Sequence, residues 1–214
     1  MRSGETVITM RTTTAAAIIL TVVASAVAPG VSTGAVASNS AYVVPEEPDV
    51  RVDVYVSASA QGDTEHVTAV SDEIRGALSD AVPGAAVSVG PAGVVSVPDD
   101  EDGSARETME WFCSAVDRDG ADAVLLLVPD SYRSDWEYGG YGKPGCGVAL
   151  GVERMDDDRY AVLALHETGH ALGLGHAHAS ASGTTVMDHD AVYSPTFEWT
   201  EYSKQTLAGR YAPA

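Results

Sequence analysis

The sequence predicts an α/β (α+β) fold, in which helices pack on a mixed, twisted sheet within a single domain. Two segments indicate strands: Arg51 to Ser57 alternates polar residues with valine, and Ala123 to Val128 is continuously apolar. Alternation is typical of a half-buried strand, and an unbroken apolar run is typical of a strand buried on both faces. Apolar residues spaced by three and four lie between and after these strands, which favours helices layered on the sheet.

The remaining elements follow in order along the chain. Apolar residues recur every three or four positions in Thr64 to Val82, so an amphipathic helix is expected there. Ala85 to Val97 holds two valine-rich runs broken by Gly90 and Pro91, which predicts a strand and a turn. The other expected elements are a helix over Ser104 to Val116, an irregular glycine-rich loop over Ser131 to Gly147, a strand over Gly147 to Glu153, a helix over Arg159 to Leu174 with Asp156 to Asp158 at its start, and a closing helix over Thr200 to Tyr211 capped by Thr200.

The strongly negative net charge excludes some classes of binding partner. The 214 residues include 12 Lys and Arg against 31 Asp and Glu, a net charge of −19, and Lys143 and Lys204 are the only lysines. Such a surface repels phosphate backbones and anionic lipids, so neither nucleic acid nor a membrane surface is an expected partner. The composition resembles that of proteins from halophilic archaea. Because the Debye length falls to about 3 Å at about 1 M salt, carboxylate repulsion would be screened there, and the protein is expected to require salt.

The amino terminus has the order of a secretory signal. An apolar run from Ala15 to Ala28 follows Arg11 and precedes the small-residue tripeptide Ala35 to Ala37. The run is shorter than the ~20 residues of a membrane-spanning helix; a buried core helix is the alternative. Residues 1–37 are therefore expected to be a signal peptide, residues 38–49 a linker and residues 50–214 the main folded domain. The protein would be secreted, or retained at the cell surface if the signal is not cut.

The chain has two cysteines, Cys113 and Cys146. In an oxidising exterior, an even pair predicts one disulfide. Two free buried thiols, or a regulatory thiol near the active site, are the alternatives.

Three histidines have the spacing of zinc ligands. His166 and His170 lie four residues apart on the predicted helix, so both imidazoles face the same side, and Glu167 lies next to the first. A helix continuing to His176 would turn that residue by about 600° from His170, about 240° past a full turn and off this face. Gly173 can end the helix and let His176 return as third ligand. The alternative is that three separate hydrogen bonds satisfy the histidines.

The segment HETGHALGLGH, His166 to His176, resembles the HExxHxxGxxH signature of the metzincin zinc endopeptidases, and its wording is most similar to the matrixin-type branch. The resemblance implies a metzincin-like catalytic domain with Met187 in the tight turn beneath the metal. His189 departs from the family, because relatives have a proline or tyrosine two residues after this methionine.

The resemblance also implies a mechanism: secreted, zinc-dependent hydrolysis of peptide bonds by a zinc-activated water, with Glu167 as general base and His166, His170 and His176 as ligands of one catalytic Zn²⁺. The partners would be protein or peptide substrates of a monomeric enzyme. The strand over Gly147 to Glu153 would be the edge strand that binds substrate, or else an interior strand. Val192 to Phe197 would wall the specificity pocket.

Several alternatives stay open. His178 could replace His176 as a ligand, and His189 could contact the site or the oxyanion instead of being a solvated loop residue. The carboxylate runs Asp99 to Asp102 and Asp156 to Asp158 could bind structural Ca²⁺ or form solvated surface. The rival functions are a zinc-binding surface module whose base is unused, and a zinc hydrolase of small amide substrates.

Overall fold

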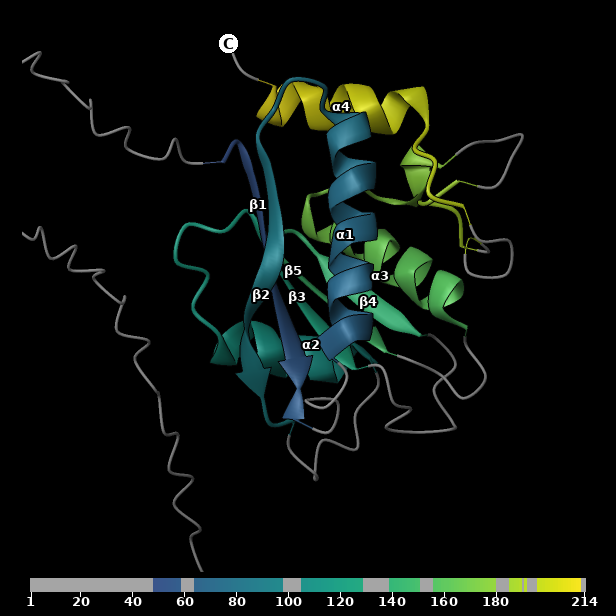
Figure 1. The fold of residues 1–214 in the computed structure, drawn as a ribbon. Coiled ribbons are helices and arrows are strands. Elements are labelled where there is room, and N and C mark those ends of the chain that lie inside the picture. The colour runs from purple at the N-terminus through teal and green to yellow at the C-terminus, as the bar shows by residue number, and fades with distance from the viewer. Residues whose placement is uncertain are drawn as a thin grey trace, which may run out of the picture. The chain divides into compact units, whose positions relative to one another are not determined.

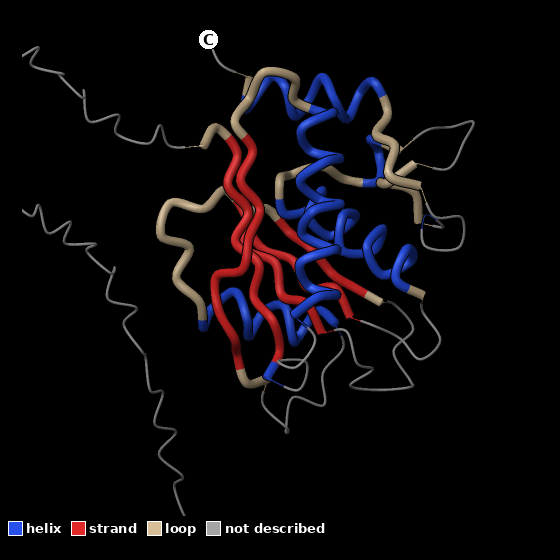
Figure 2. Tube along the Cα trace, in the orientation of Figure 1, coloured by secondary structure: helices blue, strands red, loops and turns tan. Residues whose placement is uncertain are grey.

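Five strands form one sheet in the order β2-β1-β3-β5-β4. β1 pairs in parallel with β2 and β3, β3 pairs in parallel with β5, and β4 pairs antiparallel with β5. The elements, drawn in Figures 1 and 2, are β1 (Val50–Ser57), α1 (Thr64–Ala81), β2 (Val87–Val95), α2 (Ala105–Ala115), β3 (Ala123–Val128), β4 (Gly140–Lys143), β5 (Cys146–Leu150), α3 (Asp157–Ala171), the short 3₁₀ helix η2 (His176–His178) and α4 (Glu201–Tyr211). The predicted mixed α/β fold is confirmed.

This computed structural model describes residues 48–58, 64–97, 105–128, 139–150, 156–179, 185–189, 191 and 196–212, which all lie in the unit Pro45–Ala214. The predicted signal peptide, residues 1–37, and almost all of the predicted linker, residues 38–49, lie outside them. Among the described residues, no helix combines the length and hydropathy needed to cross a membrane.

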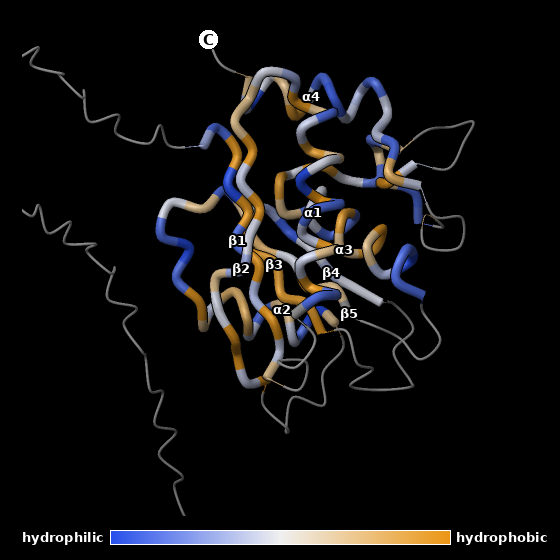
Figure 3. The backbone as a smooth tube through the Cα atoms, viewed as in Figure 1, coloured by the Kyte–Doolittle hydropathy of each residue, from blue (hydrophilic) through white to orange (hydrophobic). Residues whose placement is uncertain are grey.

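The central strand explains the two-layer core. All six residues of β3 are buried, and alternate residues face opposite sides of the sheet. Leu125 and Leu127 pack with residues of α1, α3 and α4, whereas Leu126 packs with Phe112 of α2 on the other face. Figure 3 shows apolar residues along the inner strands, and Figure 1 shows α1 crossing the sheet with α4 at its end. Helices therefore cover both faces of the sheet, as a parallel sheet requires.

The two edges of the sheet differ from the predictions. β2 continues through Gly90 and Pro91 as one strand, with an irregularity opposite Val54 and Tyr55; an edge strand tolerates proline because its outer backbone groups need no partner. At the other side, β5 lies between β3 and β4, so the prediction that Gly147 to Glu153 is the edge strand is wrong. Residues 151–153 lie outside the described residues.

The actual edge strand is β4, within the segment predicted to be an irregular loop. Its sequence, GYGK, gives no strand signal because glycine is a poor strand former. A two-residue turn of Pro144 and Gly145 connects it to β5, with Lys143 paired to Cys146 and Gly145 at φ +89°. Proline followed by a glycine at positive φ is a common turn sequence, and this hairpin brings β4 alongside α3.

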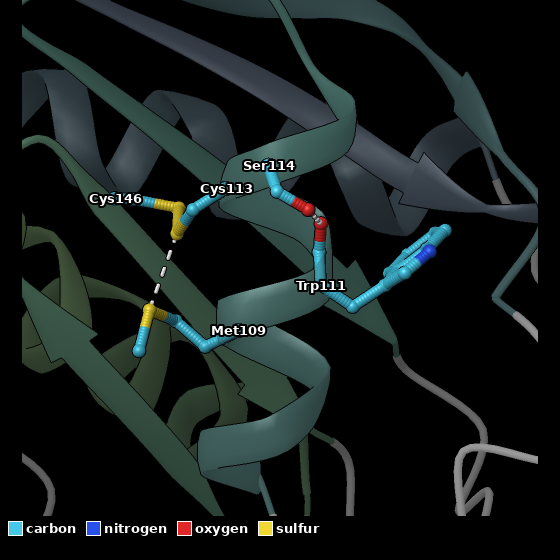
Figure 4. The surroundings of a disulfide bond; sticks show 5 residues. All are labelled: Met109, Trp111, Cys113, Ser114 and Cys146. Carbon is cyan, nitrogen blue, oxygen red and sulfur yellow. Dashed lines mark hydrogen bonds between the residues drawn. A yellow bond between two sulfur atoms is a disulfide. The ribbon is translucent and has the colours of Figure 1, made fainter.

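The disulfide prediction is confirmed. Cys113 near the end of α2 is bonded to Cys146 at the start of β5, with an S–S distance of 1.99 Å and α-carbons 6.0 Å apart. Figure 4 shows the bond together with Met109, whose Sδ lies 3.2 Å from Cys113 Sγ. The bond fastens α2 to the strand next to the edge of the sheet.

Candidate metal centre

The helix α3 begins and ends at residues that the sequence makes suitable. Asp156 caps it, since its side chain accepts a hydrogen bond from the Arg159 backbone N–H. Every residue from Tyr160 to Gly169 is buried, as expected for a helix that is apolar on most of its surface. It ends at Ala171 with Leu172 as its cap, and Gly173 follows with φ +87°. The predicted glycine break is confirmed, and the chain then turns into η2, which carries His176.

The break brings three imidazoles together. The Nε2 atoms of His166 and His170 lie 3.1 Å apart, and each lies 3.2 Å from Nε2 of His176. Tetrahedral zinc with Zn–N bonds of about 2.0–2.1 Å would hold its ligand atoms about 3.3 Å apart. The three nitrogens therefore fit one zinc ion, and within the described part of the chain this is the only His, Cys, Asp or Glu group able to hold a metal.

Hydrogen bonds orient two of these rings. The Nδ1 atom of His166 lies 2.5 Å from the Val186 carbonyl oxygen, and Nδ1 of His170 lies 3.0 Å from that of Leu174. A carbonyl only accepts, so each Nδ1 carries the proton and donates it. Each Nε2 is left with a free lone pair directed at the shared centre, which is how protein backbone fixes a metal-binding histidine.

The surroundings keep the imidazoles neutral. Burial, together with the neighbouring His170, lowers the pKa of His166 to about 4. The same two causes lower the pKa of His176 to about 4, and burial lowers the pKa of His170. The His176 side chain is exposed, but its Nε2 faces the other two rings. Neutral imidazoles can bind a metal ion without first releasing a proton.

Glu167, which follows His166 in α3, is a buried acid. Its side chain is 4% exposed, and its Oε2 has no hydrogen-bond partner. Burial raises its pKa to about 8. A buried carboxylate oxygen without a partner is costly, so this oxygen indicates a site that needs a further polar group, such as water beside a metal ion, to be complete.

Met187 lies beneath the metal-binding helix. It is 1% exposed, and a Cβ added at Gly169 would lie 2.5 Å from its Sδ and 3.2 Å from the Trp199 ring. Hydrogen bonds fix the turn around it: the Thr185 N–H donates to Asp188, and the Val186 N–H donates to Glu198. Gly169 thus allows α3 to lie directly on the methionine and the tryptophan. That Met187 forms the turn beneath the metal stays a prediction from the resemblance.

His178 and His189, whose roles the sequence left open, have different surroundings in the structure. The His178 ring stacks on Tyr202 of α4, with centroids 4.7 Å apart, and its Nδ1 lies 3.0 Å from the Gly175 backbone nitrogen. It lies outside the metal-binding group. The His189 ring lies against His176, with centroids 3.7 Å apart, so it contacts the site while remaining exposed.

The remaining sequence-based interpretations fall partly outside the described residues. Asp156 serves as a helix cap, and Asp157 Oδ1 lies 3.3 Å from His66 Nδ1. Residues 99–102 are not described, and neither are residues 192–195 of the predicted pocket wall. Phe197, the last residue of that wall, packs against the main core.

Sequence reasoning missed residues that are far from the histidine motif in the sequence but contact the helix that carries it. Gly140 and Gly142 of β4 lie against Glu167, and Arg210 of α4 donates a hydrogen bond to the Leu172 carbonyl at the end of α3. GYGK alone does not show that its glycines face a helix more than twenty residues later. No sequence signal connects Arg210 to a helix 38 residues away.

Comparisons with known proteins agree with this geometry. The family model of peptidase M66 matches residues 127–199, which contain the three histidines, Glu167 and Met187. This segment is about a third of the chain, and its HExxH-type histidine triad supports zinc-dependent peptidase activity.

Solved structures resemble the fold of this chain at low sequence identity. Archaemetzincin from Methanopyrus kandleri is 16% identical, with a TM-score of 0.60, over 78% of this chain and 98% of its own. A zinc-dependent peptidase from Methanocorpusculum labreanum is also 16% identical, with a TM-score of 0.53, over 73% of this chain and 99% of its own. A search of the curated proteins finds no match.

Proposed function

We propose that this protein is an exported endopeptidase of the metzincin type, in which Glu167 is the general base and His166, His170 and His176 hold the catalytic zinc. The observation that carries the proposal is the buried Glu167 side chain, whose Oε2 has no hydrogen-bond partner, directly after His166, one of three histidines with convergent Nε2 atoms. A module that only binds zinc has no use for such an acid, because burying it is costly.

Zinc supplies Lewis acidity at such a site, making water a nucleophile at neutral pH and polarising the scissile carbonyl. The chain's own residues provide the rest. The backbone carbonyls of Val186 and Leu174 keep the two ligand rings turned toward the centre. The His176 ring is exposed, so substrate can approach from that side.

Glu167 moves the proton. Its carboxylate takes a proton from the attacking water and passes it to the departing amine, which makes it a general base and then a general acid. Burial favours the protonated form and so raises its affinity for that proton. The burial also keeps bulk water from competing for the acid.

The edge strand supports an extended peptide as substrate. Within the described residues, β4 has a strand partner on one side only, and it lies beside Glu167. A peptide that adds to β4 as a further strand would be held by its backbone. This mode recognises the middle of a chain, which favours an endopeptidase over a hydrolase of small amides.

The proposal also covers the compartment. Residues 1–37 would direct export, and the Cys113–Cys146 disulfide supports an oxidising environment. A net charge of −19 supports function in high salt, where the self-repulsion is screened. The matrixin-type branch, structural Ca²⁺ and a monomeric state remain predictions from the sequence.

The test uses purified protein in molar salt with casein as substrate, with and without a chelator, beside Glu167→Gln. We expect one zinc per chain, hydrolysis that the chelator abolishes, and loss of activity in the variant with zinc retained. Internal cleavage products distinguish an endopeptidase from a small-amide hydrolase. A zinc-loaded but inert native protein would favour the binding module, and proteolysis by the variant would refute Glu167 as the base.

A further inference from the structure

The face of β4 that lies against Glu167 carries no side chains. Gly140 and Gly142 of β4 are on this face, and Gly142 is paired with Gly147 of β5. The alternate residues of β4, Tyr141 and Lys143, do have side chains, and both are exposed. Glycine is therefore confined to the positions that lie against the active-site helix.

The spacing leaves no room for larger residues. A Cβ at Gly140 would lie 2.5 Å from Oε1, 2.7 Å from Cγ and 2.8 Å from Cδ of Glu167. A Cβ at Gly142 would lie 2.6 Å from His170 Cβ and 2.9 Å from the Glu167 carbonyl oxygen. A Cβ at Gly147 would lie 2.9 Å from that same oxygen.

Backbone conformation does not explain these glycines. The described glycines with positive φ are Gly84, Gly120, Gly145 and Gly173, and none of the three on this face is among them. An alanine could adopt their backbone angles. What excludes alanine is the closeness of α3, and at Gly140 it is the Glu167 side chain itself.

We infer that Gly140 and Gly142 are positioning residues for Glu167, an inference that rests on the proposed role of this acid. Gly140 leaves the space that the carboxylate occupies, and Gly142 sets how closely α3 approaches the strand. Because Oε2 has no hydrogen-bond partner, no such bond fixes that oxygen. Packing against the bare strand does so instead.

Four versions of the full chain test the packing: native, Gly140→Ala, Glu167→Ala and the double variant, each isolated with its zinc content measured. The measurement is the melting temperature. When Glu167 is intact, Gly140→Ala should lower the melting temperature by about 5 °C, because the new methyl group overpacks the site. Glu167→Ala removes Cγ, Cδ and both oxygens, so Gly140→Ala should then cause little loss. The native protein need not be active for this cycle to be read.

Two further variants serve as comparisons. The methyl group of Gly142→Ala would contact the backbone of Glu167 and His170 Cβ. The resulting decrease in melting temperature should therefore persist in the Glu167→Ala background. Gly90→Ala is the matched strand control, because a Cβ there meets nothing within 4 Å. It should leave both melting temperature and activity near the native values.

Kinetics test the positioning. Gly140→Ala should reduce kcat on the order of 100-fold, as expected for a misplaced catalytic group, with KM changed less than threefold and zinc retained. Equal temperature losses in the two Glu167 backgrounds, or no loss in either, would overturn the inference, as would a native kcat in Gly140→Ala. If the native protein hydrolyses no peptide, the proposed function fails, while the temperature cycle still decides whether Gly140 makes room for Glu167.

Discussion

The Arg210 guanidinium in the last turn of α4 donates a hydrogen bond through Nη1 to the backbone carbonyl of Leu172, at the end of α3. The same guanidinium lies where a side chain of Gly173 would be. Leu172 and Gly173 form the turn that directs the chain toward His176. The C-terminal helix therefore helps to hold the turn between the second and third metal-binding histidines.

Substituting Arg210 should weaken zinc binding although the residue touches no metal ligand. Arg210→Gln shortens the side chain and removes the charge, leaving the Leu172 carbonyl without its partner. Loss of an outer hydrogen bond of this kind lowers metal affinity by about 10–100-fold. Competition with a chromogenic chelator measures the affinity. Arg159→Gln is the control at the opposite end of α3, where Arg159 and Asp156 form an exposed pair 3.6 Å apart; equal zinc affinities in the two variants would contradict the expectation.

Gly173 should be the least replaceable glycine of the motif. Its φ of +87° places it in the left-handed region, where alanine is strained by about 1–2 kcal/mol, and the new methyl group would also meet Arg210. Gly173→Ala should therefore lower both the melting temperature and the zinc content. Gly209→Ala on α4 is a suitable control because a Cβ there meets nothing within 4 Å, and helical alanine should be neutral or stabilising. Full zinc occupancy in Gly173→Ala would show that the turn tolerates a side chain.

The metal-binding helix was predictable because its signals are local. Asp156 is a typical cap, the i, i+4 spacing of His166 and His170 fixes their common face, and Gly173 is placed to end the helix. Each of these depends on residues within one or two turns, so the sequence carries it directly.

The edge strand could not be predicted because its cause lies elsewhere in the chain. β4 contains two glycines, which disfavour strands when read alone. They are required by the close approach of Glu167 and His170, more than twenty residues later. For the same reason the prediction assigned the edge to β5, whose apolar pattern suits an interior strand equally well.

Removing the disulfide should lower stability and leave metal binding intact. The bond joins residues 33 positions apart, which by the chain-entropy model contributes about 4 kcal/mol and corresponds to a melting temperature lower by on the order of 10 °C. The double variant Cys113→Ala/Cys146→Ala tests this, with Ser114→Ala as a control on the same helix. Because the ligands come from α3 and η2, zinc affinity below the melting temperature should stay within threefold of native. Zinc loss from the folded variant would mean that the disulfide supports the site.

The metal-free protein should show the strain of burying Glu167. Its pKa is raised to about 8 from 4.5 by burial, so the stability linked to this group is fully present below pH ~4.5 and is lost as the pH rises toward 8, by up to about 1.4 kcal/mol per pH unit. Glu167→Gln cannot ionise, so the chelator-treated variant should gain melting temperature over chelator-treated native protein between pH 5 and pH 8. The three histidines are common to both proteins and cancel in the difference. Glu65→Gln, at an exposed position on α1, controls for simple loss of a negative charge, and a difference that stays flat over this range would mean that the Glu167 carboxylate reaches water.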